Sequence, residues 1–561
     1  MVKWPKQILI LLIILILTIL VYLPVLNSGF VNLDDNGFIY ENIDVVSGGF
    51  HSITHFFTKF YVGHYLPLTM LSFKLDHFLF GLNAQGFHIV NLILHLFNII
   101  LVYILMQKLI REKQISLIIT ALFALHPMHV ESVAWISERK DVLYTFFLLL
   151  SLIYYVRYIS DNCSRKCFYI SLITFFLALL SKSAAVIMPF LLILIDFVLK
   201  RGFNKRVVFE KIPFFAMSVF FALLTLHSQA VGGKGSEVFA RFGGTDKLIF
   251  AFYAFGFYIV KIISPVHLSA YHPFPDIGSG NLPHGFYLII LISVVFLALM
   301  IWLIYRSIKF KSFDPILFGM LFYLFTILLY IYLPVGRVIV AERFSYLSYI
   351  GLFFILAFII NRIIQLKLSL YFNRSIQIIL VLIILLFSFL TYERSKIWQN
   401  GVSLWKNVLS EYPTDPFVNK SMADAFVMYK NYDRALDYYK KAITYDSSFA
   451  EAYYNMGIMN LKNDHIFQAI VDFSKAVEID PGLIFGYINR GNAKTQLKDY
   501  DGAIADFTLA INKNPSKAEA YVNRGSAYFL LNRKNQACYD WLIASNLGNA
   551  QAQEMLLNYC K

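Results

Sequence analysis

The chain has 561 residues, of which 58% are hydrophobic and 15% are charged, with a mean hydropathy of +0.61 and a formal net charge of +14. Soluble globular proteins are about 25% charged, so these values exclude a single water-soluble globule. The 17% aromatic content, with 54 Phe, also excludes a disordered or collagen-like chain. A charge of +14 fits either nucleic acid or a membrane as partner, and its distribution along the chain decides between them.

Long apolar runs fill the first 395 residues. Each is close to the ~20 residues that cross the hydrocarbon of a bilayer. The first run lacks a small-residue cleavage site, so we predict an uncleaved span and not a removed signal peptide. The runs are Ile8–Leu26, Phe87–Leu109, Leu143–Tyr158, Tyr287–Tyr305, Ile316–Leu333, Phe344–Ile360 and Ile376–Leu390.

The excess positive charge lies between these runs. Residues 416–561 have 16 Lys and Arg against 15 Asp and Glu, so almost all of the excess belongs to the apolar part. Basic loops are retained on the cytoplasmic side of a membrane. We therefore predict six cytoplasmic loops or ends, about 11 spans, a cytoplasmic N-terminus and an outer C-terminal third, and no nucleic-acid partner. The basic groups are Lys3/Lys6, Lys108/Arg111/Lys113, Arg157/Arg165/Lys166, Lys200/Arg201/Lys205/Arg206/Lys211, Arg306/Lys309/Lys311 and Arg362/Lys367/Arg374.

One apolar stretch does not fit this alternation. Leu248–Ile263 lies between two predicted cytoplasmic loops that already have two crossings between them, is followed by Pro265, and includes Lys261. We predict that it is re-entrant or interfacial.

The C-terminal third repeats with a period of 34 residues. Small residues recur at positions 8 and 20, aromatic residues at positions 4 and 24, and Ala at position 27. Small residues let two antiparallel helices approach closely, and the aromatic rings fill the gaps between them. The pattern predicts a tetratricopeptide solenoid, which binds peptides or proteins, with a leading helix at 398–409 and a closing helix at 550–559. The four copies are Pro416–Phe449, Ala450–Leu483, Ile484–Lys517 and Ala518–Gln551.

Two adjacent carboxylates, Asp34 and Asp35, follow the first span on the predicted outer side. Such a pair can share a proton, bind a cation or take a proton from a hydroxyl group. The alternative is a solvated turn, because Asp-Asp-Asn is also turn chemistry.

A second charged stretch, Ala121–Asp141, lies at the outer end of a predicted span and contains His126, His129, Glu131, Arg139 and Lys140. His-x2-His with a Glu resembles metal-ligand spacing, but Pro127 breaks the helix that would align the ligands. We therefore predict no metal site and expect the cations to face an anionic phosphate.

Lys182, Glu342 and Arg343 interrupt later apolar stretches on the same predicted side. A charge at the centre of a bilayer costs ~2.5–3.5 kcal/mol on insertion scales, so these side chains are expected in a cavity or at the interface. The alternative is that each extends to the lipid headgroups.

Four cysteines are present. Cys163 and Cys167 fall in a predicted cytoplasmic loop, where thiols stay reduced, whereas Cys538 and Cys560 could pair on the outer side.

Taken together, these residues resemble the transmembrane-and-tetratricopeptide protein O-mannosyltransferases, which are polytopic enzymes of the C-type glycosyltransferase superfamily. The resemblance extends over almost the whole chain, with the repeats after the last span. Its motifs are Gly29-Phe30-Val31 with Asp34-Asp35, His88 with Asn91-Leu92 and Leu94-His95, the run His126–Ala134 followed by Arg139 and Asp141, and Ala341-Glu342-Arg343 with Tyr346-Leu347.

The resemblance implies an all-α fold, in which a polytopic transmembrane bundle at 1–395 precedes a tetratricopeptide domain at 396–561. It implies an inverting glycosyltransferase that moves a sugar, expected to be mannose, from a polyprenyl-phosphate donor to Ser or Thr hydroxyls of exported polypeptides. Asp34 or Asp35 would be the base. The donor and acceptor site would include His126, His129, Glu131, Arg139, Lys140, Lys182, Glu342 and Arg343.

Two other functions fit parts of the sequence. A membrane-anchored tetratricopeptide scaffold for envelope protein assembly would need the repeats and not the carboxylates. A transporter is less favoured, because the ionisable residues gather at one predicted surface and do not cross the midplane.

Overall fold

The computed structural model describes residues 5–47, 49, 51–160, 165–202, 204–232, 242–275, 282–332, 338–366 and 370–560. The chain forms two compact units, Met1–Leu404 and Trp405–Lys561. Within the described ranges every named element is a helix, and the only β-type pairings are two isolated bridges, one of which joins Tyr61 and His64. The predicted all-α fold class is confirmed.

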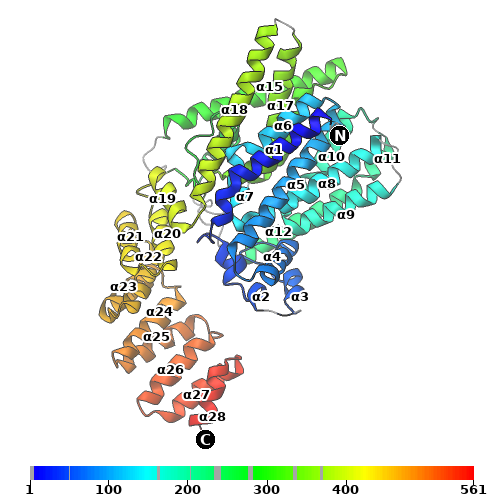
Figure 1. Cartoon of the computed structure of the whole chain (residues 1–561). Coiled ribbons are helices and arrows are strands. Elements are labelled where there is room, and N and C mark those ends of the chain that lie inside the picture. Colours follow the sequence, from blue (N-terminus) through cyan, green and yellow to red (C-terminus); the bar gives the residue numbers. More distant parts are fainter. Residues whose placement is uncertain are drawn as a thin grey trace. The chain divides into compact units, whose positions relative to one another are not determined.

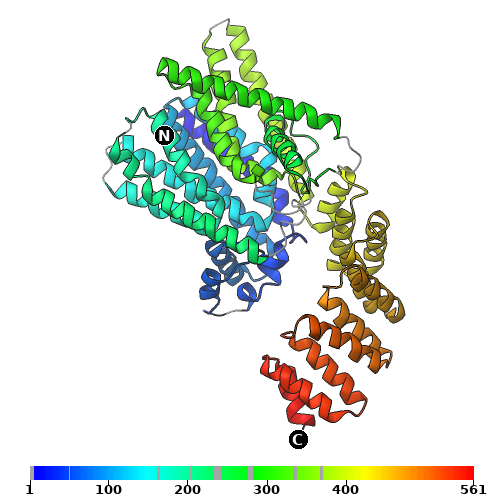
Figure 2. The same ribbon diagram turned by 180° about the vertical axis from the view of Figure 1, so that it is seen from behind.

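The first unit is a bundle of long apolar helices, seen from two opposite sides in Figures 1 and 2. Seven described segments are long and apolar enough to cross a membrane, and an eighth is a bent pair, which confirms the predicted polytopic bundle. The helices that form the seven are α1 (Lys6–Tyr22, continued by η1, Leu23–Asn27), α5 (Ala84–Ile110), α8 (Arg139–Ser160), α12 (Ile212–Gly232), α15 (His284–Phe310), α17 (Ser345–Gln365) and α18 (Leu370–Ile397).

Three shorter helices also belong to the bundle. They are α9 (Arg165–Ser181), α10 (Met188–Val198), preceded by η5 (Ser183–Ile187), and α16 (Pro315–Tyr332). Helices α9 and α16 pack along α8 and α17, respectively. The seven candidates, the bent pair and the two shorter apolar helices Ser183–Val198 and Pro315–Ile331 make ten, and counting α9 as well gives the predicted number of about 11.

Helix α14 (Gly244–Lys261) contains most of the stretch that we expect to be re-entrant or interfacial. It packs along α15 and is not among the candidate spans of the described chain. The helix has three charged side chains in 18 residues, those of Asp246, Lys247 and Lys261, whereas each segment that could cross a membrane contains an 18-residue stretch with at most two.

The bent pair of helices contains most of the charged stretch Ala121–Asp141. Helix α6 (Lys113–Leu125) ends where Pro127 cannot donate a backbone hydrogen bond, and the chain turns by 55° into η3 (Pro127–His129) and α7 (Val130–Ala134). A further turn, η4 (Ile136–Glu138), leads into α8. Short helical turns of changing direction therefore replace one straight span between residues 126 and 139.

Between α1 and α5 the chain forms a folded loop with η2 (Asn36–Tyr40), α2 (Ile43–Val46), α3 (His51–Thr58) and α4 (Pro67–Phe80). The side chain of Asp44 fixes it, because its carboxylate accepts hydrogen bonds from Tyr61 Oη at 2.9 Å and Lys59 Nζ at 3.3 Å and contacts His55 Nδ1 at 2.7 Å. The carboxylate pair thus lies on a structured segment.

In the second unit, each predicted repeat contains two antiparallel helices, coloured yellow to red in Figure 1. At the small position 8, a Cβ added to Gly491 would lie 2.7 Å from the ring of Phe507, which explains why the repeat needs a small residue there. The helices are α19 (Gly401–Glu411), α20 (Pro416–Met428), α21 (Tyr432–Tyr445), α22 (Ala450–Lys462), α23 (Ile466–Ile479), α24 (Ile484–Gln496), α25 (Tyr500–Lys513), α26 (Ala518–Leu530), α27 (Lys534–Asn546) and α28 (Ala550–Tyr559).

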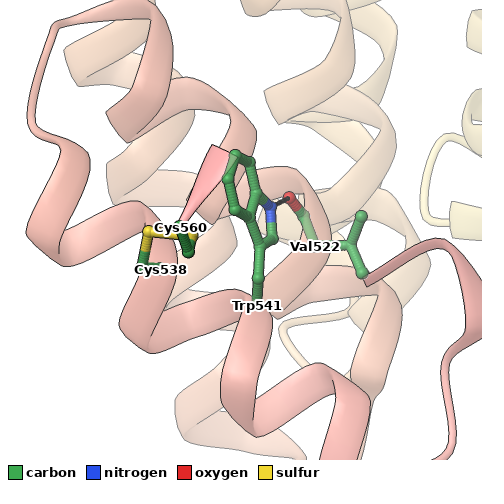
Figure 3. Close-up of a disulfide and its surroundings, with 4 residues drawn as sticks. All are labelled: Val522, Cys538, Trp541 and Cys560. Atoms are coloured by element: carbon green, nitrogen blue, oxygen red, sulfur yellow. Dashed lines mark hydrogen bonds between the residues drawn. A yellow bond between two sulfur atoms is a disulfide. The ribbon is translucent and has the colours of Figure 1, made fainter. Parts of the chain in front are cut away.

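A disulfide between Cys538 and Cys560 ties the end of α28 to α27, beside Trp541, whose indole N–H donates to Val522 O at 3.2 Å (Figure 3). Cys167 is also disulfide-bonded, which contradicts the expectation that it stays reduced. Cys163 lies outside the described residues. Proximity permits such a bond, and only the redox compartment decides whether it persists.

Candidate active site

The two carboxylates have different surroundings. Asp35 is 1% exposed, and its Oδ1 accepts hydrogen bonds from Trp135 Nε1 at 3.0 Å, Ser137 N at 3.1 Å and Ser137 Oγ at 2.5 Å. Its Oδ2 accepts from Val31 N at 2.9 Å. Asp34 is partly exposed. Asp35 is therefore held by four donors, while Asp34 beside it keeps part of its surface accessible.

Burial raises the pKa of Asp35 to about 6, and the neighbouring Asp34 raises it further, while the hydrogen bonds from Ser137 and Val31 lower it. The four donors favour the ionised form, because a carboxylate can only accept. Asp35 is thus an ionised, immobilised group at neutral pH.

Trp135 connects the carboxylate pair to the cations. Its N–H donates to Asp35, and its ring has Arg343 Cζ at 5.4 Å and Lys140 Nζ at 5.5 Å from the centroid. Trp398, near the end of α18, stacks on it at 5.8 Å with an interplanar angle of 21°. The electron-rich face of an indole attracts cations, so one side chain positions both groups.

Three cations and three carboxylates form the second part of the site. Glu138 Oε1 lies 3.0 Å from Lys140 Nζ and 3.4 Å from Arg343 Nε, and its Oε2 lies 3.8 Å from Lys182 Nζ. The other two carboxylates are Asp141, which accepts a hydrogen bond from Lys182 Nζ, and Glu131, which accepts from the backbone N and Nη1 of Arg343 at 3.0 and 2.5 Å. We call Lys140, Lys182 and Arg343, with Glu131, Glu138 and Asp141, the outer cluster.

The outer cluster joins segments far apart in sequence: α7, η4 and the start of α8, the end of α9, and η6 (Glu342–Phe344). Its carboxylates are at most 2% exposed, whereas Lys182 and Arg343 keep 13% and 18% of their side-chain surface accessible. The buried carboxylates therefore hold the cations in place, and the accessible surface of the cluster belongs mainly to Lys182 and Arg343.

His64, which the sequence did not single out, faces the same cluster. Burial lowers its pKa to about 3, and the charges of Lys140, Lys182 and Arg343 lower it further, with Glu138 acting in the opposite direction. It is a neutral imidazole at physiological pH. Only the folded loop between α1 and α5 brings it here.

The structure places His126 and His129 elsewhere. His129 Nδ1 donates to Phe123 O at 2.8 Å, and His126 Nε2 lies 3.2 Å from Ile262 O. Both rings are fully buried among aromatic side chains. These rings are Phe123, Tyr346, Tyr349, Phe353 and Phe387.

Arg139 and Glu342 pair away from the outer cluster. Arg139 is fully buried, and its guanidinium donates to Asp76 on α4 at 2.7 Å and to Phe87 O at 2.8 Å. Glu342 accepts hydrogen bonds from Arg394 on α18, from Nη2 at 3.0 and 3.1 Å and from Nε at 3.3 Å. Both fix helices to one another. The only sequence signal for Asp76 and Arg394 was a charged residue within or beside an apolar segment.

The polar stripe on α5 also connects helices. Asn91 donates to Val133 O and Trp135 O, both at 3.2 Å, and His95 Nδ1 lies 2.7 Å from Tyr346 Oη. These contacts satisfy backbone groups that the broken span leaves without helical partners. Among the described residues, no group of three or more His, Cys, Asp or Glu is arranged to hold a metal ion.

Comparison with known proteins finds two family models. The model described as dolichyl-phosphate-mannose-protein mannosyltransferase matches residues 67–228, and the TPR repeat model matches 423–464 and 491–532. The protein O-mannosyl-transferase F38B6.6 of Caenorhabditis elegans is 26% identical over 439 residues, which cover 73% of this chain and 59% of that protein. The protein O-mannosyl-transferase TMTC1 of Mus musculus is 40% identical over 116 residues, covering 20% of this chain and 12% of the mouse protein.

This chain is related to the transmembrane-and-tetratricopeptide protein O-mannosyl-transferases. The predicted family resemblance is confirmed by both family models and by these relatives. The chain matches less than two thirds of the length of either relative. Among solved structures, that of MamA is 21% identical over 29% of this chain and 94% of its own, with a TM-score of 0.27, too low to carry an argument.

The family's mannosyltransferase model covers only part of the site. Residues 67–228 include Lys140, Lys182 and three carboxylates of the outer cluster, whereas Asp34, Asp35 and Arg343 lie outside them. The contacts of Trp135 join the two parts.

Proposed function

We propose that this protein is a membrane glycosyltransferase that moves mannose from a polyprenyl-phosphate donor to Ser or Thr hydroxyls of exported polypeptides. The observation that carries the proposal is the junction at Trp135, where a carboxylate pair and a cluster of cations meet. Glycosyl transfer needs these two parts: a group that takes the hydroxyl proton and charges that stabilise the departing phosphate. The family relationship supports the same activity.

In this proposal Asp34 is the base. Asp35 is 1% exposed and accepts four hydrogen bonds from the protein, so an acceptor hydroxyl has little access to it, whereas Asp34 is partly exposed on the same turn. Asp35 would position the loop and keep its negative charge beside Asp34.

The reaction is a single displacement. The acceptor oxygen forms a bond to the anomeric carbon as Asp34 takes its proton, and the bond from that carbon to the phosphate oxygen breaks with its electron pair going to the phosphate. Attack from the face opposite the phosphate inverts the configuration. Arg343 and Lys182, the more accessible cations of the outer cluster, would neutralise the departing phosphate, and Lys140 would support them.

Topology belongs to the same proposal. The basic loops favour a cytoplasmic N-terminus, which would put Asp34, the outer cluster and the repeats on the non-cytoplasmic side. There they would meet exported polypeptides.

Transfer from a polyprenyl-phosphate mannose to a Ser/Thr peptide tests the proposal. In purified protein, Asp34→Asn should lower the rate by at least about 1,000-fold, because removal of a base and its charge affects only the transition state. Glu393→Gln, an exposed carboxylate on α18, is the matched control and should keep the wild-type rate.

Full activity of Asp34→Asn, Asp35→Asn and the double variant would exclude the proposal. If the protein is instead a scaffold for envelope protein assembly, the carboxylates would be dispensable for that assembly. Gly491→Arg, which forces a large side chain against Phe507, would then abolish the assembly.

A further inference from the structure

Four buried side chains share one face at the end of helix α18. Their spacing of i, i+3, i+4 and i+7 brings them into a single stripe along a helix, and each is at most 5% exposed. On the other side of the same turns, Glu393 and Lys396 keep 47% and 40% of their side-chain surface accessible. We call the four residues the α18 face; they are Thr391, Arg394, Ser395 and Trp398.

The α18 face holds the segment that leads to the carboxylate pair. Ser395 Oγ donates to Val21 O, at the end of α1, at 3.2 Å. Directly after the α18 face, the backbone O of Gln399 accepts a hydrogen bond from Gly29 N at 2.9 Å. Gly29 lies five residues before Asp34. The chain between the first span and the carboxylates is therefore attached to the end of α18 at two points.

The bent pair of α6 and α7 is held by the same face. Thr391 Oγ1 donates to Leu125 O at 2.7 Å. Helix α6 ends at Leu125, so this carbonyl has no following helical turn to donate to it, and Thr391 supplies the hydrogen bond. Trp398 stacks on Trp135, whose indole N–H donates to Asp35. Both the break in the span and the residue at the centre of the site are thus fixed from α18.

Arg394 holds the third segment, η6. Its Nη2 donates to both carboxylate oxygens of Glu342, and its Nη1 donates to Leu268 O at 3.0 Å. A guanidinium with several bonds to a carboxylate fixes orientation as well as distance. The residue after Glu342 is Arg343, the most accessible cation of the outer cluster. Arg394 therefore fixes the backbone from which this cation extends.

Trp398 contributes to the site through its ring surface. Its Nε1 is buried and has no hydrogen-bond partner among the residues that the structure describes. A buried N–H without a partner destabilises a fold, so a phenylalanine would pack here without that cost. What the indole adds is a larger flat surface, and this surface lies on Trp135 at an interplanar angle of 21°.

We propose that the α18 face positions the base and the phosphate-binding cations relative to each other, with Trp398 as the positioning residue between them. The proposal rests on the proposed function, because it assigns these residues a role in sugar transfer. In an inverting displacement the base and the phosphate lie on opposite sides of the sugar, so the two parts of the site must keep a fixed separation. A misplacement of about 1 Å lowers such a rate about 100-fold.

Sugar transfer by Trp398→Leu tests the proposal. This variant removes the stacked surface and leaves every carboxylate and cation of the site in the chain. We expect kcat to fall about 10- to 100-fold, with the donor KM within about threefold of the wild type. Trp398→Phe keeps an aromatic surface and should retain at least about a third of the wild-type kcat. The matched control, Glu393→Gln/Lys396→Met on the exposed side of the same turns, should keep the wild-type rate.

A double-variant cycle shows whether Trp398 acts through Trp135. If it does, Trp398→Leu should lower kcat by at most about twofold in a Trp135→Leu background, because the ring that it positions is already gone. Additive losses would overturn the proposal, as would a wild-type kcat of Trp398→Leu in the wild-type background.

Thr391→Val gives a second test if the melting temperature shows that Trp398→Leu does not fold. It removes the hydrogen bond to Leu125 O and nearly preserves the size of the side chain. We expect kcat to fall at least about fivefold with a nearly unchanged donor KM, because the bent pair loses its attachment to α18. A wild-type kcat would contradict the proposal.

Near-ultraviolet circular dichroism keeps this proposal distinct from the proposed function. Two stacked indoles couple, so the spectral changes caused by Trp135→Phe and Trp398→Phe should not add up in the double variant. Additive changes would overturn the stack and the proposal with it. If the wild type transfers no sugar while the changes are non-additive, the proposed function fails, and the positioning of Trp135 by Trp398 stands.

Discussion

Helix α8 has a buried charged network at each end, and the two differ. The outer cluster lies at its start. At its other end, about 21 Å away at 1.5 Å per residue, Tyr155 donates to Asp196 at 2.8 Å, and Asp196 lies 2.5 Å from Lys211 Nζ. Arg201 lies 2.6 Å from Glu210. We call Tyr155, Asp196, Arg201, Glu210 and Lys211 the inner network.

The inner network joins only neighbouring parts of the bundle, namely α8, α10 and the segment between α10 and α12. Each acid has a basic partner within 15 residues in sequence. The outer cluster instead joins residues more than 200 positions apart, such as Glu131 and Arg343, and continues through Trp135 to Asp35. Burial of charge is therefore common to both networks, but only the outer cluster is joined, through Trp135, to a carboxylate pair of which one member, Asp34, is partly exposed.

Loss of Arg343 should produce the largest difference between the two ends. Arg343→Met removes the most accessible cation, and we expect at least 100-fold slower transfer, because one charge that stabilises a developing anion is worth about 10²–10³ in rate. The assay is sugar transfer under saturating acceptor. Arg206→Met, an exposed arginine beside the inner network, is the control and should be active. Equal losses in both variants would mean that the outer cluster has no special role.

Loss of Lys211 should lower stability and not the transfer rate, which is the opposite of the effect expected for Arg343. Lys211→Met leaves Asp196 buried without its nearest cation, which costs about 3–5 kcal/mol of stability. We expect a clearly lower melting temperature and a normal transfer rate per folded molecule. The double variant Asp196→Asn/Lys211→Met should recover most of the stability. A normal melting temperature with lost transfer would assign catalysis to the inner network.

Trp135 should show two separable effects. Trp135→Phe keeps an aromatic face for Arg343 but removes the N–H bonded to Asp35, so we expect about tenfold lower kcat with a nearly unchanged KM for the donor. Trp135→Leu also removes the face, and the donor KM should then rise. A purely structural role for Trp135 predicts parallel losses of folded protein in both variants and no such division.

The pH dependence sharpens the role of Asp35. Its pKa of about 6 in the folded protein means that transfer should rise as the pH passes through about 6, when the carboxylate ionises. Stability should change in the opposite direction: because the folded pKa is above the ordinary 3.8, the folded state holds the proton more tightly, and this stabilisation is lost as the pH rises from about 4 to 6. Ser137→Ala removes a hydrogen bond to the ionised form and should move the rise in rate to higher pH.

The sequence predicted the repeats far better than the site, and the reason is physical. A 34-residue period fixes the register of every helix, so even the closing helix at 550–559 coincides with α28. The run from His126 to Asp141 has no such period, because Pro127 and three short turns rotate successive side chains in different directions. Its charged character was visible, but the inward direction of His126, His129 and Arg139 was not.

The sequence also did not predict which charged residues from distant helices would form ion pairs. Asp76 and Arg394 have charged neighbours close in sequence, and nothing local indicates that they pair instead with the distant Arg139 and Glu342. Adjacent residues also separate: Glu342 pairs with α18, whereas Arg343 enters the outer cluster. Such choices depend on how the helices pack.

Cysteine reactivity decides which end of α8 faces the cytoplasm, with the smallest expected effect on activity. Cys167, at the start of α9, has Phe168 beside it, which contacts Tyr158 near the inner network, so it reports on the inner end. If the basic loops are cytoplasmic, the reducing compartment should open the disulfide of Cys167, which should then react with a thiol reagent in intact cells, while Cys538 and Cys560 stay paired until a reductant is added. Cys538→Ser, which opens the disulfide between Cys538 and Cys560, should leave the rate of sugar transfer to a short Ser-containing peptide unchanged. A reactive Cys538 together with a protected Cys167 would place the inner network outside, and the carboxylate pair could then not meet exported polypeptides.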